Sequence, residues 1–385
     1  MEKIKNEINK YINSNKEEML SLWESFVNIE TGSDNKEGID KLASIIKDIL
    51  IDEGFDVNIM EVSSGGNTIF AEKKGNSNKL PIIIMGHMDT VFSKGTLEKR
   101  PFTVEDNVVK GPGALDMKGG LVTAIYAIKA LNKFGYNDRT IKVMFSGDEE
   151  VGHKYSDSHD DIMNFSKGSE ACFNVETGSI KNEITIGRKG NILFNIETHG
   201  VSSHAGADHK KGVSSILEIA HKIIEIEKLT DYNSGITFNV GIIQGGTKPN
   251  VRPDYATIEV DCRFEKLNQR EIIINKIENI VKNSYIEGSK SKMTYRLNFY
   301  PMEKTKENLE LLEKINSFSK ELGFRSLKPK YSGGSSDSSN SVRAGVPTLC
   351  ALGVKGENNH SQDEYALLES LYERTMLLTY SIYNF

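Results

Sequence analysis

An unbroken apolar run that ends in polar side chains constrains the fold of this chain more than any other feature. Residues 82–85 are Ile-Ile-Ile-Met, and Gly86, His87, Met88 and Asp89 follow directly. A short apolar run bounded by glycine is typical of a strand buried on both faces of a parallel sheet. Polar groups at the carboxyl end of such a strand lie where open α/β sheets bind ligands. His87 and Asp89 point the same way on an extended chain, so one can bind a metal while the other orients a neighbouring group; the alternative is a core histidine paired with a carboxylate.

The composition is ordinary for a soluble globular chain and excludes several classes of partner. The chain has 385 residues, 38% hydrophobic and 26% charged, so two domains with a large core are expected. The net charge is −6 and the Lys and Arg residues are dispersed, which argues against a nucleic-acid partner. We find no apolar signal core and no run as long as a membrane span, so we expect a cytoplasmic protein with no membrane partner. Three well-separated cysteines are expected to be buried thiols: Cys172, Cys262 and Cys350.

Residues 1–182 alternate between strand-like and helix-like patterns. Apolar residues repeat at helical spacing in residues 34–53, where Asp34 is the expected N-cap. Strands are expected at 56–61, 67–73, 81–86, 140–145 and 171–175, helices at 2–30, 34–53 and 117–134, and a loop at 92–115. This alternation predicts an α/β domain with a mostly parallel sheet covered by helices on both faces.

The pattern changes between residues 183 and 297. The expected order there is a strand at 191–198, a helix at 212–229, strands at 236–243 and 255–264, a helix at 268–284 and a strand at 292–299. This βαββαβ order predicts a small ferredoxin-like α+β domain, residues 183–297, inserted into the first domain. Residues 298–385 are predicted to resume the first domain, with a helix at 306–322, a strand at 346–352, a loop at 353–361 and a last helix from about 363.

Five acidic or imidazole side chains follow predicted strands or lie in adjoining loops: His87, Asp116, Glu150, Glu176 and His360. Two imidazoles and three carboxylates suit zinc, with cobalt or manganese as substitutes. Five ligands exceed the four of one closed tetrahedral site, and a carboxylate can bridge two ions. Two metal ions per chain, roughly 3.5–4 Å apart, therefore explain the set better than one.

Glu149 and Glu150 are adjacent at the end of the strand predicted at 140–145. Adjacent side chains at a strand end point apart, so one carboxylate can bind a metal while the other takes a proton from water. The alternative is a solvated acidic turn. The metal-site interpretation is favoured over this alternative because four other ligand candidates also follow predicted strands or lie in adjoining loops.

Other polar residues are open to more than one reading. The glycines at 111–113 and 119–120 match a phosphate-binding loop weakly, because no Lys-Ser/Thr follows them. His153 and His159 are expected on surfaces or helix faces. His204 lies in a glycine-flanked loop, where functional residues often occur.

Several segments together resemble the M20 metallopeptidase family, most closely its glutamate carboxypeptidase (carboxypeptidase G2-like) branch. The matching segments run in the family's order: Gly86-His87-Met88-Asp89-Thr90-Val91, Gly111-Pro112-Gly113-Ala114-Leu115-Asp116-Met117-Lys118-Gly119-Gly120, Ser146-Gly147-Asp148-Glu149-Glu150-Val151-Gly152, Val175-Glu176, Ser203-His204-Ala205-Gly206 and His360-Ser361. The predicted inserted domain agrees with this family's layout as well.

The resemblance implies a role for each matched residue. His87 and Glu176 would hold one metal ion, Glu150 and His360 the other, and Asp116 would bridge them. Asp89 would orient His87, and Glu149 would be the general base and then the acid that protonates the leaving amine. His204 would stabilise the oxyanion, Asn250 and Arg263 would hold the substrate's carboxylate, and Gly334 would line the pocket. The inserted domain would mediate a homodimer.

We therefore expect a di-metal exopeptidase or amidohydrolase that releases a C-terminal amino acid. Arg252 and the serine-rich segment 335–339 depart from the family pattern and are expected to affect the side-chain pocket. An N-acyl amino acid deacylase or deacetylase with the same chemistry is an alternative. A non-catalytic dimeric binding protein is a more distant one, and a dinucleotide-binding enzyme is disfavoured because no Gly-x-Gly-x-x-Gly follows the first strand.

Overall fold

A computed structural model describes residues 2–385 and divides the chain into two compact units. The first unit contains the chain up to Gly187, Lys304–Ser332 and Ser336–Phe385; the second contains Arg188–Glu303 and Gly333–Ser335. The inserted segment was expected at 183–297. In the structure β9 (Glu183–Arg188) belongs to the first unit up to Gly187, because this strand pairs with β16 (Lys328–Ser332).

The first unit is built on a six-stranded mixed sheet with β3 (Ile82–His87) in its middle. The strand order is β1 (Asp56–Met60), β2 (Thr68–Lys73), β6 (Ile141–Ser146), β3, β7 (Ala171–Asn174) and β17 (Thr348–Leu349). β6, β3, β7 and β17 run parallel, whereas β1 and β2 add antiparallel pairs at one edge. Every residue of β3 is buried, as the apolar run predicts.

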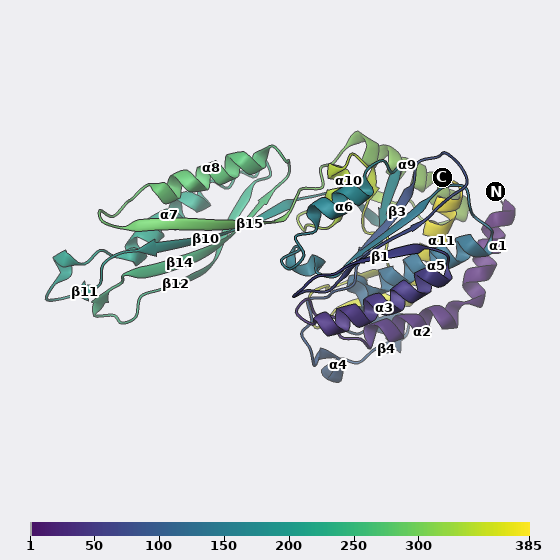
Figure 1. Ribbon diagram of the computed structural model, residues 1–385, viewed down its shortest axis with the longest axis horizontal. Helices are drawn as coiled ribbons and strands as arrows, with labels where there is room; N and C mark the ends of the chain where they lie inside the picture. The colour runs from purple at the N-terminus through teal and green to yellow at the C-terminus, as the bar shows by residue number, and fades with distance from the viewer. Residues whose placement is uncertain (1) are drawn as a thin grey trace. The chain divides into compact units, whose positions relative to one another are not determined.

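Helices cover both faces of this sheet, which confirms the predicted α/β class (Figure 1). Ile82 and Ile84 pack into the core under α3 and α5, whereas Ile83 and Met85 pack into a separate core that includes Ile162 of α6. This alternation is what a strand buried on both faces requires. The helices of the first unit are α1 (Glu2–Ser14), α2 (Lys16–Val27), α3 (Lys36–Asp52), α4 (Thr96–Lys99), α5 (Gly119–Lys133), α6 (His159–Ser166), α9 (Lys306–Leu322), α10 (Ser338–Arg343) and α11 (Leu368–Tyr383).

Local details differ from the expectation in several places. The helix expected at 2–30 is divided into α1 and α2. The N-cap of α3 is Asn35, whose side chain accepts the Gly38 N–H at 3.4 Å, and not Asp34.

A second sheet of short strands was not predicted. Its order is β4 (Thr103–Glu105), β5 (Val108–Lys110), β19 (Tyr365–Leu367), β18 (Lys355–Glu357) and β8 (Gly178–Ser179). β4, β5 and β18 lie in segments expected to be loops, and β19 lies where the last helix was expected to begin, at about 363, whereas that helix begins at Leu368. Strands this short carry too little periodicity to be predicted from sequence.

The second unit is a four-stranded antiparallel sheet with two helices, as the βαββαβ pattern predicts. Its elements are β10 (Gly190–His199), α7 (Ser215–Glu227), β12 (Thr237–Gly245), β14 (Tyr255–Phe264), α8 (Gln269–Lys282) and β15 (Lys290–Phe299). The strand order is β12-β14-β10-β15, and alternate residues of β14 from 256 to 264 are buried in the unit's core. Two short strands, β11 (Ser203–His204) and β13 (Val251–Arg252), pair separately.

The three cysteines are buried thiols, as expected. Within residues 2–385, no helix combines the length and the apolar character that crossing a membrane would require.

Candidate active site

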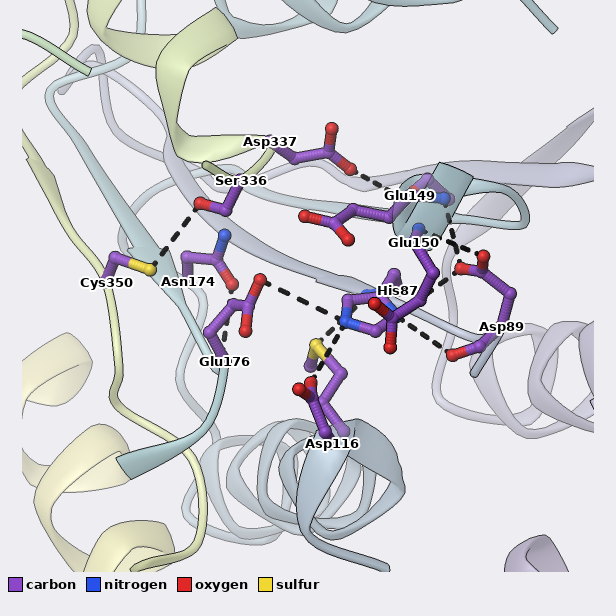
Figure 2. Close-up of polar contacts among 12 residues, drawn as sticks. His87, Asp89, Asp116, Glu149, Glu150, Asn174, Glu176, Ser336, Asp337 and Cys350 are labelled. Atoms are coloured by element: carbon purple, nitrogen blue, oxygen red, sulfur yellow. Dashed lines mark hydrogen bonds and ion pairs between the residues drawn. The ribbon is translucent and has the colours of Figure 1, made fainter. Parts of the chain in front are cut away.

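The carboxyl ends of three adjacent parallel strands bring the predicted site residues of the first unit together. His87 ends β3, Glu149 and Glu150 follow β6, and Glu176 follows β7. Asp116 comes from the turn Ala114–Lys118, which leads into α5. Figure 2 shows the carboxylates of Asp116, Glu149, Glu150 and Glu176 directed into the space beside His87.

Asp116 faces two different imidazoles with its two oxygens. Its Oδ1 lies 3.3 Å from Nε2 of His87, and its Oδ2 lies 3.2 Å from Nε2 of His360. Glu176 Oε1 is 4.0 Å from His87 Nε2, and Glu150 Oε2 is 3.2 Å from His360 Nε2. The five side chains thus form two histidine–carboxylate groups that share Asp116.

Asp89 is buried and connects the end of β3 to the turn after β6. Its two carboxylate oxygens accept the main-chain N–H groups of Glu149 and Glu150, both at 3.1 Å, and the Ser33 hydroxyl donates to it at 2.7 Å. Nδ1 of His87 lies 3.0 Å from the main-chain oxygen of Asp89 and 3.4 Å from its carboxylate. Asp89 therefore contacts His87 mainly through its backbone, and its carboxylate mainly fixes the Glu149–Glu150 turn.

The turn that carries Asp116 is held by its surroundings. Trp23 Nε1 donates to the Ala114 oxygen at 3.0 Å, and the Glu364 carboxylate accepts the Leu115 N–H at 3.2 Å. A Cβ at Gly120 would lie 1.9 Å from the Val175 oxygen, so only glycine lets α5 start this close to β7. This contact explains the glycine pair at 119–120 without a phosphate ligand.

In the second unit, His204 and Asn250 lie on neighbouring backbone segments. β11 pairs with β13, and the Ala205 N–H donates to the Asn250 oxygen at 3.0 Å. Nδ1 of His204 accepts the N–H groups of Gly206 and Ala207 at 3.1 and 3.0 Å. Because Nδ1 is occupied as an acceptor, the neutral ring carries its proton on Nε2, which is exposed as a donor.

Arg252 points away from the side on which His204 lies. Arg252 is paired with Ser203 and His204 with Val251, and successive side chains of a strand alternate. The Arg252 guanidinium contacts His209 Nε2 at 2.9 Å and the Gly212 oxygen at 3.3 Å. These contacts tie Arg252 to the segment that follows β11, and they do not support the expected effect of Arg252 on the side-chain pocket.

Arg263, on β14, is held by a bidentate ion pair within the second unit. Its Nε and Nη2 donate to the two oxygens of Asp261 at 2.8 and 3.0 Å, and its Nη1 donates to the Ser335 hydroxyl at 3.3 Å. Gly334 lies next to Ser335, is exposed, and its oxygen accepts from Arg188 at 3.4 Å.

Comparison with known proteins identifies the family of this chain and agrees with its fold. Residues 83–384 match the peptidase family M20/M25/M40. The chain belongs to this family. Carboxypeptidase G2 of Pseudomonas sp. (strain RS-16) is 28% identical over 362 residues, which are 92% of this chain and 86% of that protein. Succinyl-diaminopimelate desuccinylase of Ehrlichia ruminantium (strain Gardel) is 24% identical over 89% of this chain and 92% of its own. The crystal structure of aminopeptidase PepT from Bacillus cereus ATCC 10987 superposes with a TM-score of 0.78 at 19% identity, covering 96% of this chain and 98% of that one.

The charges at this M20 site perturb one another strongly. Burial raises the pKa of Glu149, and Glu176, Asp337 and Glu150 raise it further, so it lies well above the ordinary value despite His87. Burial and the charge of Asp116 raise the pKa of Glu150 to about 7. Burial alone would lower the pKa of His87, but the surrounding carboxylates outweigh it and raise that pKa well above the usual value.

The residues fit divalent cations. Ligand atoms of His87, Glu149 and Glu176 lie within 4.8 Å of one another, as do those of His87, Asp116 and Glu150. Within residues 2–385, Glu150 Oε1 is buried without a hydrogen-bond partner, and Asp116 Oδ1 is buried with no partner closer than His87 Nε2 at 3.3 Å. Such oxygens are costly to bury without a partner, and a bound cation would give them one.

A buried network behind Glu149 was missed by the sequence analysis. His153 and His159 are only 3% and 6% exposed, so neither lies on the surface, which was one of the two positions expected for them. The His153 ring lies between two carboxylates: Nδ1 is 3.2 Å from Asp148 Oδ1, and Nε2 is hydrogen-bonded to Asp337. Asp337 also accepts the Ser146 hydroxyl at 2.6 Å. The sequence signal for this network is Asp148, which directly precedes Glu149.

The serine-rich segment 335–339 is an internal support. Residues 336–339 are no more than 1% exposed. Ser336 contacts Cys350 Sγ at 3.7 Å (Figure 2). Ser338 accepts from Asn174 at 2.8 Å, and the Asn174 oxygen accepts the Glu176 N–H at 3.1 Å. The expectation that this segment reshapes a substrate pocket is therefore unsupported for residues 336–339.

Proposed function

We propose that this M20 family member is a di-metal hydrolase that cleaves a peptide or N-acyl amide bond beside a free carboxylate and releases a C-terminal amino acid. The observation that carries the proposal is Asp116, whose two oxygens face His87 and His360 separately. This arrangement suits one carboxylate that bridges two ions, with His87 and Glu176 at one and Glu150 and His360 at the other. Zinc suits these ligands best, and cobalt or manganese can replace it.

Bound ions would polarise the scissile carbonyl and lower the pKa of the attacking water. Glu149 takes the proton from that water and later gives it to the leaving amine. Asp89 keeps the carboxylate in place by binding the two main-chain N–H groups of the turn.

The second unit would bind the substrate. We propose that Nε2–H of His204 donates to the developing oxyanion, supported by the two N–H groups that occupy Nδ1. Asn250 and Arg263 would bind the carboxylate, and Gly334 would line this pocket.

A deacylase is the second candidate, because the same residues would cleave an N-acyl amino acid. A relative named as a desuccinylase matches 89% of this chain. The test is hydrolysis of a panel by zinc- or cobalt-loaded protein: dipeptides, N-acetyl and N-benzoyl amino acids, and an acyl-glutamate, with Glu149→Gln as the blank. Cleavage of dipeptides or acyl-glutamates favours the carboxypeptidase, and cleavage of N-acetyl amino acids alone favours the deacylase. No cleavage by metal-loaded protein would contradict both.

We also propose a homodimer formed through the second unit, in which His204 serves the partner's site. Inactive His204→Ala and inactive Glu149→Gln proteins are mixed and allowed to exchange subunits. Return of part of the activity is the expected result. No return, with exchange demonstrated by a mass-tagged subunit, would contradict the assignment of His204 to the partner's site.

A further inference from the structure

The Arg263 guanidinium has two different edges that can each bind a carboxylate. Within residues 2–385, a carboxylate occupies only one of these edges. The side edge, formed by Nε and Nη2, donates both of its bonds to Asp261. The end edge, formed by Nη1 and Nη2, retains one N–H on each nitrogen, because Ser335 takes the other Nη1 proton. A carboxylate can bind such an end edge with two parallel hydrogen bonds.

Asp261 is itself fixed by its neighbours. Asn191, directly across from Arg263 on β10, donates to Asp261 Oδ2 at 2.8 Å. The Asn191 oxygen in turn accepts from Asn298 at 2.7 Å, which sets the orientation of the Asn191 amide. The aspartate is therefore held from one side by an amide donor and from the other by the arginine.

Ser335 gives Arg263 a second support of a different kind. Its hydroxyl proton goes to the Lys189 oxygen at 2.8 Å, which leaves the hydroxyl oxygen to accept from Nη1. This support carries no charge. Asp261 and Ser335 together hold the guanidinium on two sides although its side chain is 34% exposed.

We propose that Asp261 is a positioning residue that holds Arg263 with its end edge free for the substrate's carboxylate. The proposal rests on the proposed function, in which Arg263 binds that carboxylate. An unrestrained arginine on an exposed strand would lose considerable rotamer entropy when it binds. Because Asp261 already orders the Arg263 side chain before substrate binds, less entropy is lost on binding. The interaction between Arg263 and the substrate's carboxylate then contributes more to affinity.

A purely electrostatic view predicts the opposite result. Asp261 neutralises Arg263 and would repel a second carboxylate, so its removal would then tighten binding. Positioning outweighs repulsion at this site because both groups are about one-third exposed, where water screens the charges.

The test compares Asp261→Asn with Glu259→Gln, a matched control that removes an exposed carboxylate from the same face of β14. For the panel substrate that wild type cleaves best, Asp261→Asn is expected to raise KM about tenfold with kcat within about twofold. The carboxamide analogue of that substrate should show no such change. Ser335→Ala, which removes a support without changing charge, should raise KM about two- to threefold. Glu259→Gln should leave both constants unchanged.

A second measurement is independent of turnover. In ¹⁵N NMR, the Arg263 Nε–H and Nη signals, assigned by their loss in Arg263→Lys, should show slow rotation about Nε–Cζ in wild type and fast rotation in Asp261→Asn. An unchanged or lower KM together with unchanged signals would overturn the proposal. If wild type cleaves no substrate of the panel, the proposed function fails. The NMR spectra alone then show whether Asp261 holds the Arg263 guanidinium. If the spectra change but Arg263→Lys binds substrate normally, Asp261 positions Arg263 and the carboxylate role of Arg263 is wrong.

Discussion

The main-chain N–H of Glu149 donates to the carboxylate of Asp89 at 3.1 Å, although the two residues belong to different strand ends. The other oxygen of this carboxylate accepts the Glu150 N–H. One buried side chain thus fixes the backbone of both the proposed base and a proposed metal ligand.

Asp89→Asn should therefore impair activity without unfolding the protein. The amide has one acceptor oxygen in place of two, and its NH2 group would face a main-chain N–H. We expect kcat to fall about 10- to 100-fold, measured at saturating substrate. Asp56→Asn, at the exposed start of β1, is the control and should behave like wild type. Equal activity of the two variants would show that the Asp89 carboxylate is dispensable.

Glu149→Gln should abolish turnover and keep the fold. The amide cannot take a proton, so kcat should fall about 10²- to 10⁴-fold. Metal content per chain and the thermal midpoint should stay close to wild type. Glu105→Gln, in exposed β4, is the matched control. A Glu149→Gln protein with near-normal kcat would exclude Glu149 as the base.

Metal removal should destabilise the first unit. The carboxylates of Glu149 and Glu176 lie close together, and so do those of Asp116 and Glu150, so the members of each pair repel one another when both are charged and no cation is bound. At a free metal concentration about 100 times Kd, the native state should gain about 2.7 kcal/mol per independent ion. Differential scanning fluorimetry with and without chelator measures this shift. Elemental analysis should find two ions per chain, and a single ion at saturation would contradict the bridging role of Asp116.

His153 should make stability depend on pH on the alkaline side. Burial alone would lower the pKa of His153, but Asp337 and Asp148 raise it to about 10. An unfolded histidine titrates near about 6.5, so the stabilisation is full below that pH and is lost as pH rises toward about 10. His153→Asn should cost about 3–5 kcal/mol near pH 6 and less at pH 9, by urea unfolding. His221→Asn, on the exposed side of α7, is the control. If the destabilisation by His153→Asn does not become smaller as pH rises, His153 is neutral in the folded protein.

Arg374→Met should leave stability unchanged or increase it. Arg374 is fully buried, and none of its guanidinium nitrogens has a hydrogen-bond partner within residues 2–385. Burial lowers its pKa to about 10. Replacing a buried unpaired charge with an apolar side chain of similar length should change the free energy of unfolding by about 0 to +3 kcal/mol. Arg139→Met is the contrast, because Arg139 is paired with Glu170 at 2.6 Å and should lose stability. Clear destabilisation by Arg374→Met would point to ordered water or an anion at the guanidinium.

The sequence predicted the main elements because their periodicity is strong. The apolar run at 82–85 identified a central strand, and the change of pattern near 183 identified a second α+β unit. The positions of His87, Glu150 and Glu176 just after such strands made them candidate metal ligands, since neighbouring parallel strands end at the same edge of a sheet.

Other features could not be read from the sequence because they depend on tertiary contacts. His153 and Asp337 are 184 positions apart and have no shared motif, yet they are hydrogen-bonded in the buried interior. Asp261 and Arg263 lie two residues apart, but the freedom of one guanidinium edge depends on Ser335, far along the chain. The family resemblance could not predict these contacts either, because the matched motifs do not contain His153, Asp337, Asp261 or Ser335.

The contact between Trp23 and Ala114 gives the protein an internal optical reporter. Trp23 is the single tryptophan of the chain, is fully buried, and donates to the turn that carries Asp116 two residues later. Its emission is therefore free of contributions from other indoles. Any movement of that turn when ions bind would change the polarity around this one ring, so a fluorimeter could follow assembly of the site in the unlabelled, unmodified chain.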